Sequence, residues 1–299
     1  MKQISALLVL IAFHFSHVSG QQTENYKRKS MVNYQYKLAA KVKSRTLIVP
    51  IGNVPDDYDR EMRKSLEKFW DFTPYEIVSS SEQNRYLLSE NHAVLLTYQE
   101  LSGVFVSGYS LKIVLGDKKY SKAEYATKIV SFSLPHTTEP ITKKEVIMNF
   151  NHLIPLIIKN MNHFLHERYD KIEKPITKAN MAQYYGDAQE KMKGRTLYFD
   201  KSTIRTGFST EDFSKNCGLP STSYKMATKE EISEAVMNGN DKVAIIYGSY
   251  SSYKHVFDPS TGTILCSTSD MNKQKTNSIG TIAIIGSVVI GLLTIFLTQ

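Results

Sequence analysis

The feature that most constrains the fold of this 299-residue chain is a stretch of sequence that occurs twice. VKSRTLIV at residues 42–49 returns as MKGRTLYF at residues 192–199, so that a basic residue, a small residue, arginine, threonine and leucine recur in order. Two residues that favour strands follow each time. The two leucines, Leu47 and Leu197, are 197 − 47 = 150 residues apart. Self-similarity at a fixed spacing indicates a repeated structural unit.

The first copy shows the pattern of alternating strands and helices. Apolar runs bounded by turn residues predict strands over residues 46–51, 75–78, 93–98, 103–115 and 125–134. A helix is expected to begin at Asp56 or Asp57, because an aspartate side chain can accept a hydrogen bond from the first turn. Ser79 and Glu82 stand at the spacing of a capping box and predict a second, shorter helix.

The second copy repeats this order at a nearly constant offset. Tyr224 matches Tyr75 at 224 − 75 = 149, and Thr228 with Glu231 repeats the capping-box spacing. Residues 243–247 repeat the strand over residues 93–97 at an offset of 243 − 93 = 150. Strands over residues 253–257 and 263–266 flank a turn that contains proline and glycine.

The sequence therefore predicts an α+β protein built from two copies of a β-α-β-α-β-hairpin unit. The units are expected over residues 45–135 and 195–269. A helical connector over residues 136–194 joins them, and Pro155 is expected to end or kink a helix there. Residues 21–44 are polar and basic, and we expect them to form an irregular leading segment.

The two ends of the chain carry targeting signals. Residues 1–20 combine a basic start, a short apolar run and small residues, which is typical of a secretory signal peptide. Residues 278–297 contain no charged side chain and are long enough, as a helix, to cross a bilayer core of about 30 Å. A polar spacer over residues 270–277 precedes them. The alternative is a cleaved lipid-anchor signal with small residues at 267–269.

Charge and motifs narrow the function classes. The formal net charge is +8, but basic and acidic residues are interspersed, which is typical of a solvated surface. Export argues against a nucleic-acid partner. The chain lacks the phosphate-binding, dinucleotide-binding, zinc-protease and nucleophile-elbow motifs, and we expect no cofactor. The expected partners are a membrane, through the C-terminal helix, and an envelope protein or polysaccharide.

A metal site is one candidate that the residue types suggest. His163, His166 and Glu167 lie within about one turn of an expected helix, where imidazole and carboxylate groups could hold a divalent cation. The alternative is that these residues are the polar flanks of a helix whose apolar residues face the core. The spacing gives no H-E-x-x-H motif.

An aromatic and basic strip is a second candidate, this time for binding. Its members are Tyr247, Tyr250, Tyr253, Lys254 and His255. Aromatic rings with polar tips suit sugar, peptide or partner surfaces. The alternative is core packing, because tyrosine favours strands and alternate residues of a strand must face the core.

Two cysteines, Cys217 and Cys266, lie in the second copy. An oxidising compartment would let them form a disulfide bond. Two buried thiols are the alternative, because the sequence does not give the separation that a disulfide requires.

The stretches RTLIVPI, EKFWDFTPYEIV and HAVLLT resemble uncharacterised exported envelope proteins of Gram-negative bacteria that carry paired α/β units. The resemblance covers residues 45–135 and 195–266 and implies an α/β fold and an envelope location. It carries no catalytic residues. The duplicated strands, the missing catalytic motifs and the aromatic candidates at strand edges favour an exported, membrane-anchored binding or assembly module without enzyme activity. An envelope hydrolase with an unrecognised active site is the alternative.

The C-terminal anchor can be tested by membrane fractionation. Full-length protein should stay in the membrane fraction after a carbonate wash, because about 20 uncharged residues can span the hydrocarbon core. Recovery of full-length protein in the soluble fraction would contradict an anchor. A membrane-bound form that lacks the residues after about 270 would favour the lipid anchor over the spanning helix.

Overall fold

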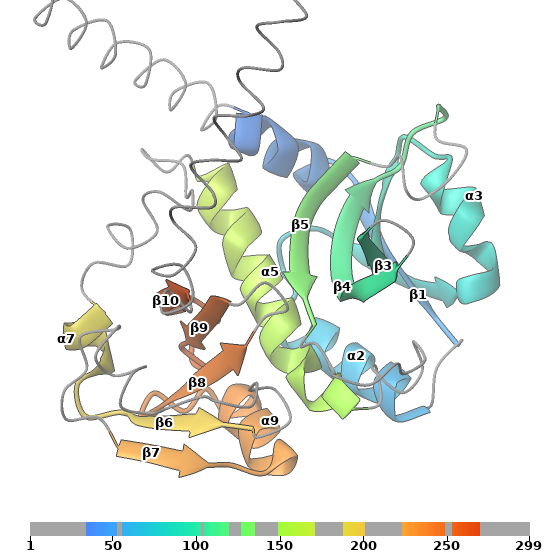
Figure 1. Ribbon diagram of the computed structural model, residues 1–299. Helices are drawn as coiled ribbons and strands as arrows, with labels where there is room; N and C mark the ends of the chain where they lie inside the picture. Colours follow the sequence, from blue (N-terminus) through green and yellow to red (C-terminus); the bar gives the residue numbers. More distant parts are fainter. Residues whose placement is uncertain are drawn as a thin grey trace, which may run out of the picture.

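The computed structural model describes residues 34–52, 56–102, 105–119, 127–134, 149–170, 188–200, 223–248 and 253–269. The described strands form two five-stranded mixed sheets, and helix α5 (Ile154–Tyr169) lies between them (Figure 1). The predicted α+β class is therefore confirmed.

The first sheet has the strand order β2-β1-β3-β4-β5. Strand β1 pairs in parallel with both β2 and β3, and the remaining pairs are antiparallel. Its elements are β1 (Thr46–Ile51), α2 (Asp56–Phe69), β2 (Tyr75–Ser79), η1 (Ser80–Glu82), α3 (Gln83–Leu87), β3 (His92–Ser102), β4 (Phe105–Leu115) and β5 (Thr127–Ser133).

The second sheet has the order β10-β9-β8-β6-β7, which is the same topology. Strand β6 pairs in parallel with β7 and β8, and β8, β9 and β10 form antiparallel pairs. Its elements are β6 (Thr196–Phe199), β7 (Ser223–Met226), α9 (Lys229–Met237), β8 (Val243–Gly248), β9 (Tyr253–Phe257) and β10 (Ile264–Ser269). The chain between the sheets also contains η3 (Asn151–Leu153) and α7 (Ala188–Met192).

Strand pairing follows the same topology in both units and corrects one detail of the predicted repeat. Leu47 lies opposite Ala93 on β3, and Leu197 lies opposite Ala244 on β8. The third strands are therefore offset by 244 − 93 = 151 residues, one more than the predicted 150. The error arose because both runs are continuously apolar, so their pattern does not reveal which residues face which side.

The repeated arginine makes an equivalent contact in each copy. Arg45 Nη1 donates to the carbonyl oxygens of His92 (3.1 Å) and Gly116 (2.8 Å). Arg195 Nη1 lies 3.4 Å from the carbonyl oxygen of Val243 and donates to it. His92 and Val243 are the first residues of β3 and β8. Each arginine therefore ties the start of the central strand to the start of its parallel neighbour.

A helix precedes the central strand in both copies, which the sequence analysis missed for the first one. Residues 34–43 are helical, whereas we expected an irregular segment over residues 21–44. Val42 is fully buried, and Met192 of α7, at 192 − 42 = 150, is buried in the second copy. The apolar side of the first helix is short, because only Ala39 and Val42 are buried, and the polar residues around it concealed the pattern.

The two expected capping boxes have different outcomes. Thr228 Oγ1 accepts from the backbone of Glu231, and the Glu231 side chain accepts from the backbone of Thr228, so this capping box is confirmed. Ser79 Oγ instead accepts from the backbone of Ser81. It caps the 3₁₀ turn η1, which separates it from α3 and leaves no box with Glu82.

The two copies turn opposite faces toward α5. In the first sheet, the face of Leu47 and Ala93 belongs to the large core that contains the buried residues of α5. The equivalent face of the second sheet, which carries Leu197, forms a separate small core with Met192. The other face of the second sheet, with Tyr247, joins the large core together with α9.

Helix α5 is bound to both copies by side-chain hydrogen bonds. Asn162 Oδ1 accepts from the backbone of Phe72 in the first copy (3.1 Å). Lys159 Nζ and Asn160 Nδ2 donate to the carbonyl oxygens of Pro259 (2.7 Å) and Gly262 (2.8 Å), in the turn between β9 and β10. The pairing of residues about a hundred positions apart fixes the second copy on the helix.

The predicted signal peptide, the spacer over residues 270–277 and the apolar segment over residues 278–297 lie outside the described residues and stay predictions. Among the helices that the structure describes, none combines the length and the apolar character that a membrane crossing requires.

Replacing Gly262 by alanine should destabilise the protein more than replacing Gly194. Both glycines have a positive φ, +78° and +75°. A Cβ at Gly262 would lie 2.8 and 2.9 Å from backbone atoms of α5, whereas one at Gly194 would meet nothing within 4 Å. We expect Gly194→Ala to cost about 1 kcal/mol and Gly262→Ala about 2–4 kcal/mol in the free energy of unfolding, measured in urea. Equal losses would contradict the close contact with α5.

Candidate functional site

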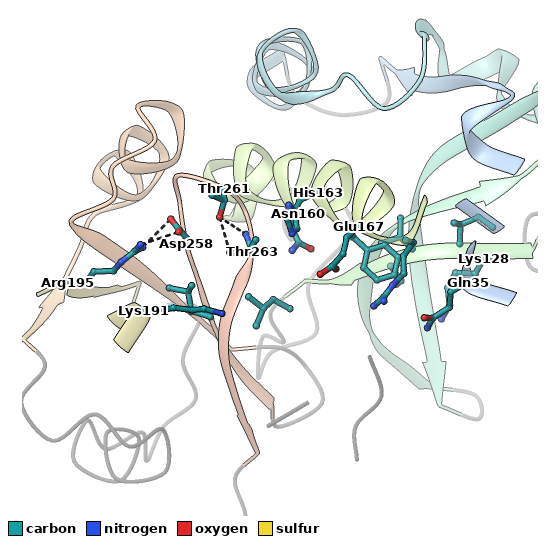
Figure 2. A pocket seen from close by; sticks show the side chains of 17 residues that line it. Gln35, Lys128, Asn160, His163, Glu167, Lys191, Arg195, Asp258, Thr261 and Thr263 are labelled. Atoms are coloured by element: carbon teal, nitrogen blue, oxygen red, sulfur yellow. Dashed lines mark hydrogen bonds and ion pairs between the residues drawn. The ribbon is translucent and has the colours of Figure 1, made fainter. Parts of the chain in front are cut away.

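A cleft of about 920 Å³ lies between the two copies and is called the inter-unit cleft below. Figure 2 shows side chains of α5 that point into it, including His163 and Glu167, with Lys128 on one side and Arg195 on the other. Its walls come from β5 of the first sheet, from the start of β10 in the second sheet, and from α5 between them. The cleft thus exists only because both copies pack on one helix.

The cleft runs along the edges of two sheets. β5 and β10 are the last strands in their sheets. Four consecutive residues of β5, 128–131, line the cleft. Three consecutive residues around the start of β10, 263–265, line it as well. Successive side chains of a strand point to opposite faces, so consecutive residues line one cavity only along an edge or at a bulge. The pairing register shifts in both strands, at Ile129 and at Leu265, which indicates a bulge in each.

Positive charge prevails among the described residues of the cleft. They include the cations Lys128, Arg168, Lys191 and Arg195 and the carboxylates Glu167 and Asp258. Lys128 and Lys191 are exposed, so their ammonium groups are accessible. Arg168 is 2% exposed, and its guanidinium group lies 4.7 Å from the centre of the Phe164 ring. The cleft therefore suits an anionic ligand.

An ion pair at one end neutralises part of this charge. Arg195 Nη1 lies 3.1 Å from Asp258 Oδ1. Burial would raise the pKa of Asp258, but hydrogen bonds from Arg195 and Ser260 outweigh it and hold this pKa below its ordinary value. Asp258 therefore stays ionised at neutral pH and fixes Arg195, the arginine of the repeated motif, at the wall of the cleft.

The structure separates the three residues of the predicted metal site. His163 and Glu167 line the cleft. His166 lies on another side of α5, with Nε2 2.8 Å from Asp71 Oδ1. No group of three or more histidine, cysteine, aspartate or glutamate side chains with metal-binding geometry occurs in the described parts of the chain.

Burial shifts the pKa values of His163 and Glu167, the two members of the predicted metal site that line the cleft. It lowers the pKa of His163, and the nearby His166 lowers it further. Burial also raises the pKa of Glu167, which the charge of Arg168 partly offsets. At neutral pH the imidazole of His163 is therefore uncharged.

Several residues of the cleft escaped the sequence analysis. Gln35, Lys128, Asn160 and Lys191 line it but belong to no recognisable motif. The Oε1 atom of Gln35 is buried and has no hydrogen-bond partner among the described residues. The sequence signal that points nearest to the site is the repeated Arg195, which we interpreted as structural only.

The structure places the aromatic strip partly in the interior. Tyr247 is 1% exposed, and its ring packs 4.9 Å from that of Phe132 on β5. His255 lies opposite Tyr247 on β9 and is partly buried beside Phe257. Tyr247 thus helps to join the two sheets, as core packing requires, whereas the ring contact of His255 is with Phe257 on its own strand.

The structure describes no side chain for the other three members of the strip. Tyr253 and Lys254 belong to β9, but their side chains are not among those described, and Tyr250 lies outside the described residues. Cys266 is buried on β10, whereas Cys217 lies outside the described residues, so the disulfide stays a prediction.

Stability should fall on mild acidification because of His255. Burial lowers its pKa from 6.5 to about 4 in the folded state. As the pH falls below 6.5, the unfolded chain therefore binds a proton that the folded protein does not. This residue should reduce the free energy of unfolding by about 2–4 kcal/mol between pH 6.5 and 4.

Urea unfolding of the wild type and of His255→Phe across this pH range measures the effect. The variant should lose less stability than the wild type over the same interval, while His163 contributes equally to both. Identical losses in the two proteins would show that His255 titrates normally.

Comparison of the chain with protein-family models, with curated proteins and with solved structures finds no match. The function is therefore inferred from the geometry and charge of the described residues.

Proposed function

We propose that this protein is a binding or assembly module that takes up a short, extended, acidic peptide segment of a partner protein in the inter-unit cleft. As the two ends of the sequence indicate, the module acts outside the cytosol and is anchored to a membrane. The observation that carries the proposal is that edge strands of two sheets, β5 and β10, line one positively charged cleft.

Edge strands favour a peptide as the occupant. They present backbone N–H and C=O groups that an added strand can pair with. The bulges at Ile129 and Leu265 discourage the pairing of whole sheets, and both residues line the cleft. A short segment can pair beside a bulge and place an apolar side chain on Ile129, which is only partly buried.

The positive charge of the cleft favours a negatively charged ligand. The exposed Lys128 and Lys191 belong to different copies, so a ligand that contacts both must cross the cleft. Carboxylates spaced along an extended segment meet both requirements. Because the two ammonium groups are exposed, they contribute more to the rate of association than to its free energy.

A hydrolase is the second candidate, and His163 with Glu167 is the observation that favours it. These residues stand one turn apart on α5, and burial lowers the pKa of His163 and raises the pKa of Glu167. Such shifts suit general acid–base catalysis. In that case the cleft would bind a peptide and cleave it, and His163→Gln would abolish cleavage while leaving binding intact.

Fluorescence anisotropy with a labelled peptide of alternating valine and glutamate tests the proposed function. Full-length protein in detergent should bind it in low salt and should not bind the valine–lysine counterpart. Replacing Lys128 and Lys191 by glutamate should weaken binding about tenfold or more, because two favourable charge contacts become repulsive. Lys64→Glu, an exposed substitution on α2, is the matched control and should bind like the wild type.

Two further probes can contradict the proposal. The same peptide with N-methyl groups along one edge should bind weakly, because it cannot pair with β5 or β10. Equal binding of the N-methylated peptide would refute pairing at a sheet edge. Binding of an acidic polysaccharide such as polyglucuronate, without binding of the peptide, would refute a peptide ligand.

A further inference from the structure

A second hollow, of about 400 Å³, lies on another part of the molecule and is called the acidic groove below. It is formed by α2 of the first copy, η3 of the connector and α9 of the second copy. It shares no lining residue with the inter-unit cleft. Its described lining residues are Asp57, Arg60, Glu61, Asn151, His152, Lys229, Glu230, Ser233 and Glu234.

Carboxylates prevail at this groove. Four of them face two cations, Arg60 and Lys229, among the lining residues. Arg60 Nη2 lies 2.7 Å from Asp57 Oδ1, so this cation is already paired. Glu230 and Glu234 stand one turn apart on the exposed side of α9. The surplus of negative charge favours a positively charged ligand.

A buried histidine at the groove provides an independent indication of a ligand. The side chain of His152 is 4% exposed, and its Nε2 lies 3.2 Å from Asp200 Oδ2. Neither Nδ1 nor Nε2 of His152 makes a hydrogen bond to a described residue, and both atoms are buried. A buried acceptor without a donor is unfavourable, and an N–H group of a ligand would satisfy it.

The acidic groove lies near the end of the second sheet at which α/β proteins commonly bind ligands. Asp200 directly follows β6, whose parallel neighbours β7 and β8 lie on opposite sides of it. Ligands of open α/β sheets bind beyond the carboxyl ends of the strands, where the strand order reverses. Asp200 and the start of α9 both lie at this end of the second sheet.

We propose that the acidic groove binds a small organic cation that carries a guanidinium or ammonium group. Its N–H groups donate to Nδ1 of His152 and to the carboxylates of Glu230 and Glu234. A guanidinium group matches carboxylates in geometry because it presents several N–H donors in one plane. A bare metal ion fits less well, since the described residues offer no cluster of three metal ligands.

Calorimetric titration of full-length protein with agmatine, which carries both cationic groups, tests this proposal. Binding should be saturable in low salt, and the double variant Glu230→Gln, Glu234→Gln should bind about tenfold or more weakly. Both side chains are exposed, so the double variant should keep the fold. Glu82, on η1, is partly exposed and lines neither hollow, so Glu82→Gln is the matched control and should bind like the wild type. A second variant, His152→Phe, should also weaken binding, because it removes the acceptor.

Three outcomes would overturn the proposal. The first is a lack of heat from agmatine up to about 10 mM, a concentration at which even weak, millimolar binding would register. The second is equal affinity in the wild type and in the double glutamine variant. The third is calcium binding that agmatine does not displace, which would assign the groove to a metal ion. The Lys128 and Lys191 glutamate variant should bind agmatine normally, so failure of the peptide proposal would leave this test unaffected.

Discussion

The burial of α5 is the constraint on which the rest of the structure depends. No residue of this helix is fully exposed, and its apolar residues are buried against the first sheet, α2 and α9 at once. A helix that is apolar around much of its circumference cannot stay soluble on one sheet alone. The second copy supplies the missing cover, and the turn between β9 and β10 locks it in place through Lys159 and Asn160. Removing either copy would expose the core of the other.

Helix α5 and the turn that precedes it contribute to both of the hollows described above. Its polar side, with His163 and Glu167, is left between two sheet edges and forms the floor of the inter-unit cleft. The turn that precedes it, η3, brings His152 to the carboxyl end of β6. The connector therefore does more than join two repeats. It places charged groups from distant parts of the chain beside the ends and edges of both sheets, where backbone and side-chain groups are accessible.

The sequence predicted the local structure far better than the sites. β1 and β9 have the bounds that we expected, because proline, glycine and aspartate mark their ends. The relative position of the copies leaves no such mark, since it depends on which face of each sheet is buried. Both faces of the central strands are apolar, so Leu197 and Tyr198 look alike as core residues. Lys128 and Lys191 are separated by 63 residues, 191 − 128, and only the packing on α5 brings them to one cleft.

The use of opposite faces by the two copies bears on how the chain arose. A symmetric dimer with a two-fold axis buries the same surface on both subunits, so fusion of its genes would give two repeats that share equivalent faces. Here the face of Leu47 meets α5, whereas the equivalent face of Leu197 points elsewhere. The two units are therefore not related to α5 as the subunits of a two-fold symmetric pair would be. Equivalent positions therefore have different surroundings, since Leu47 lies in the large core around α5 and Leu197 in the separate small core.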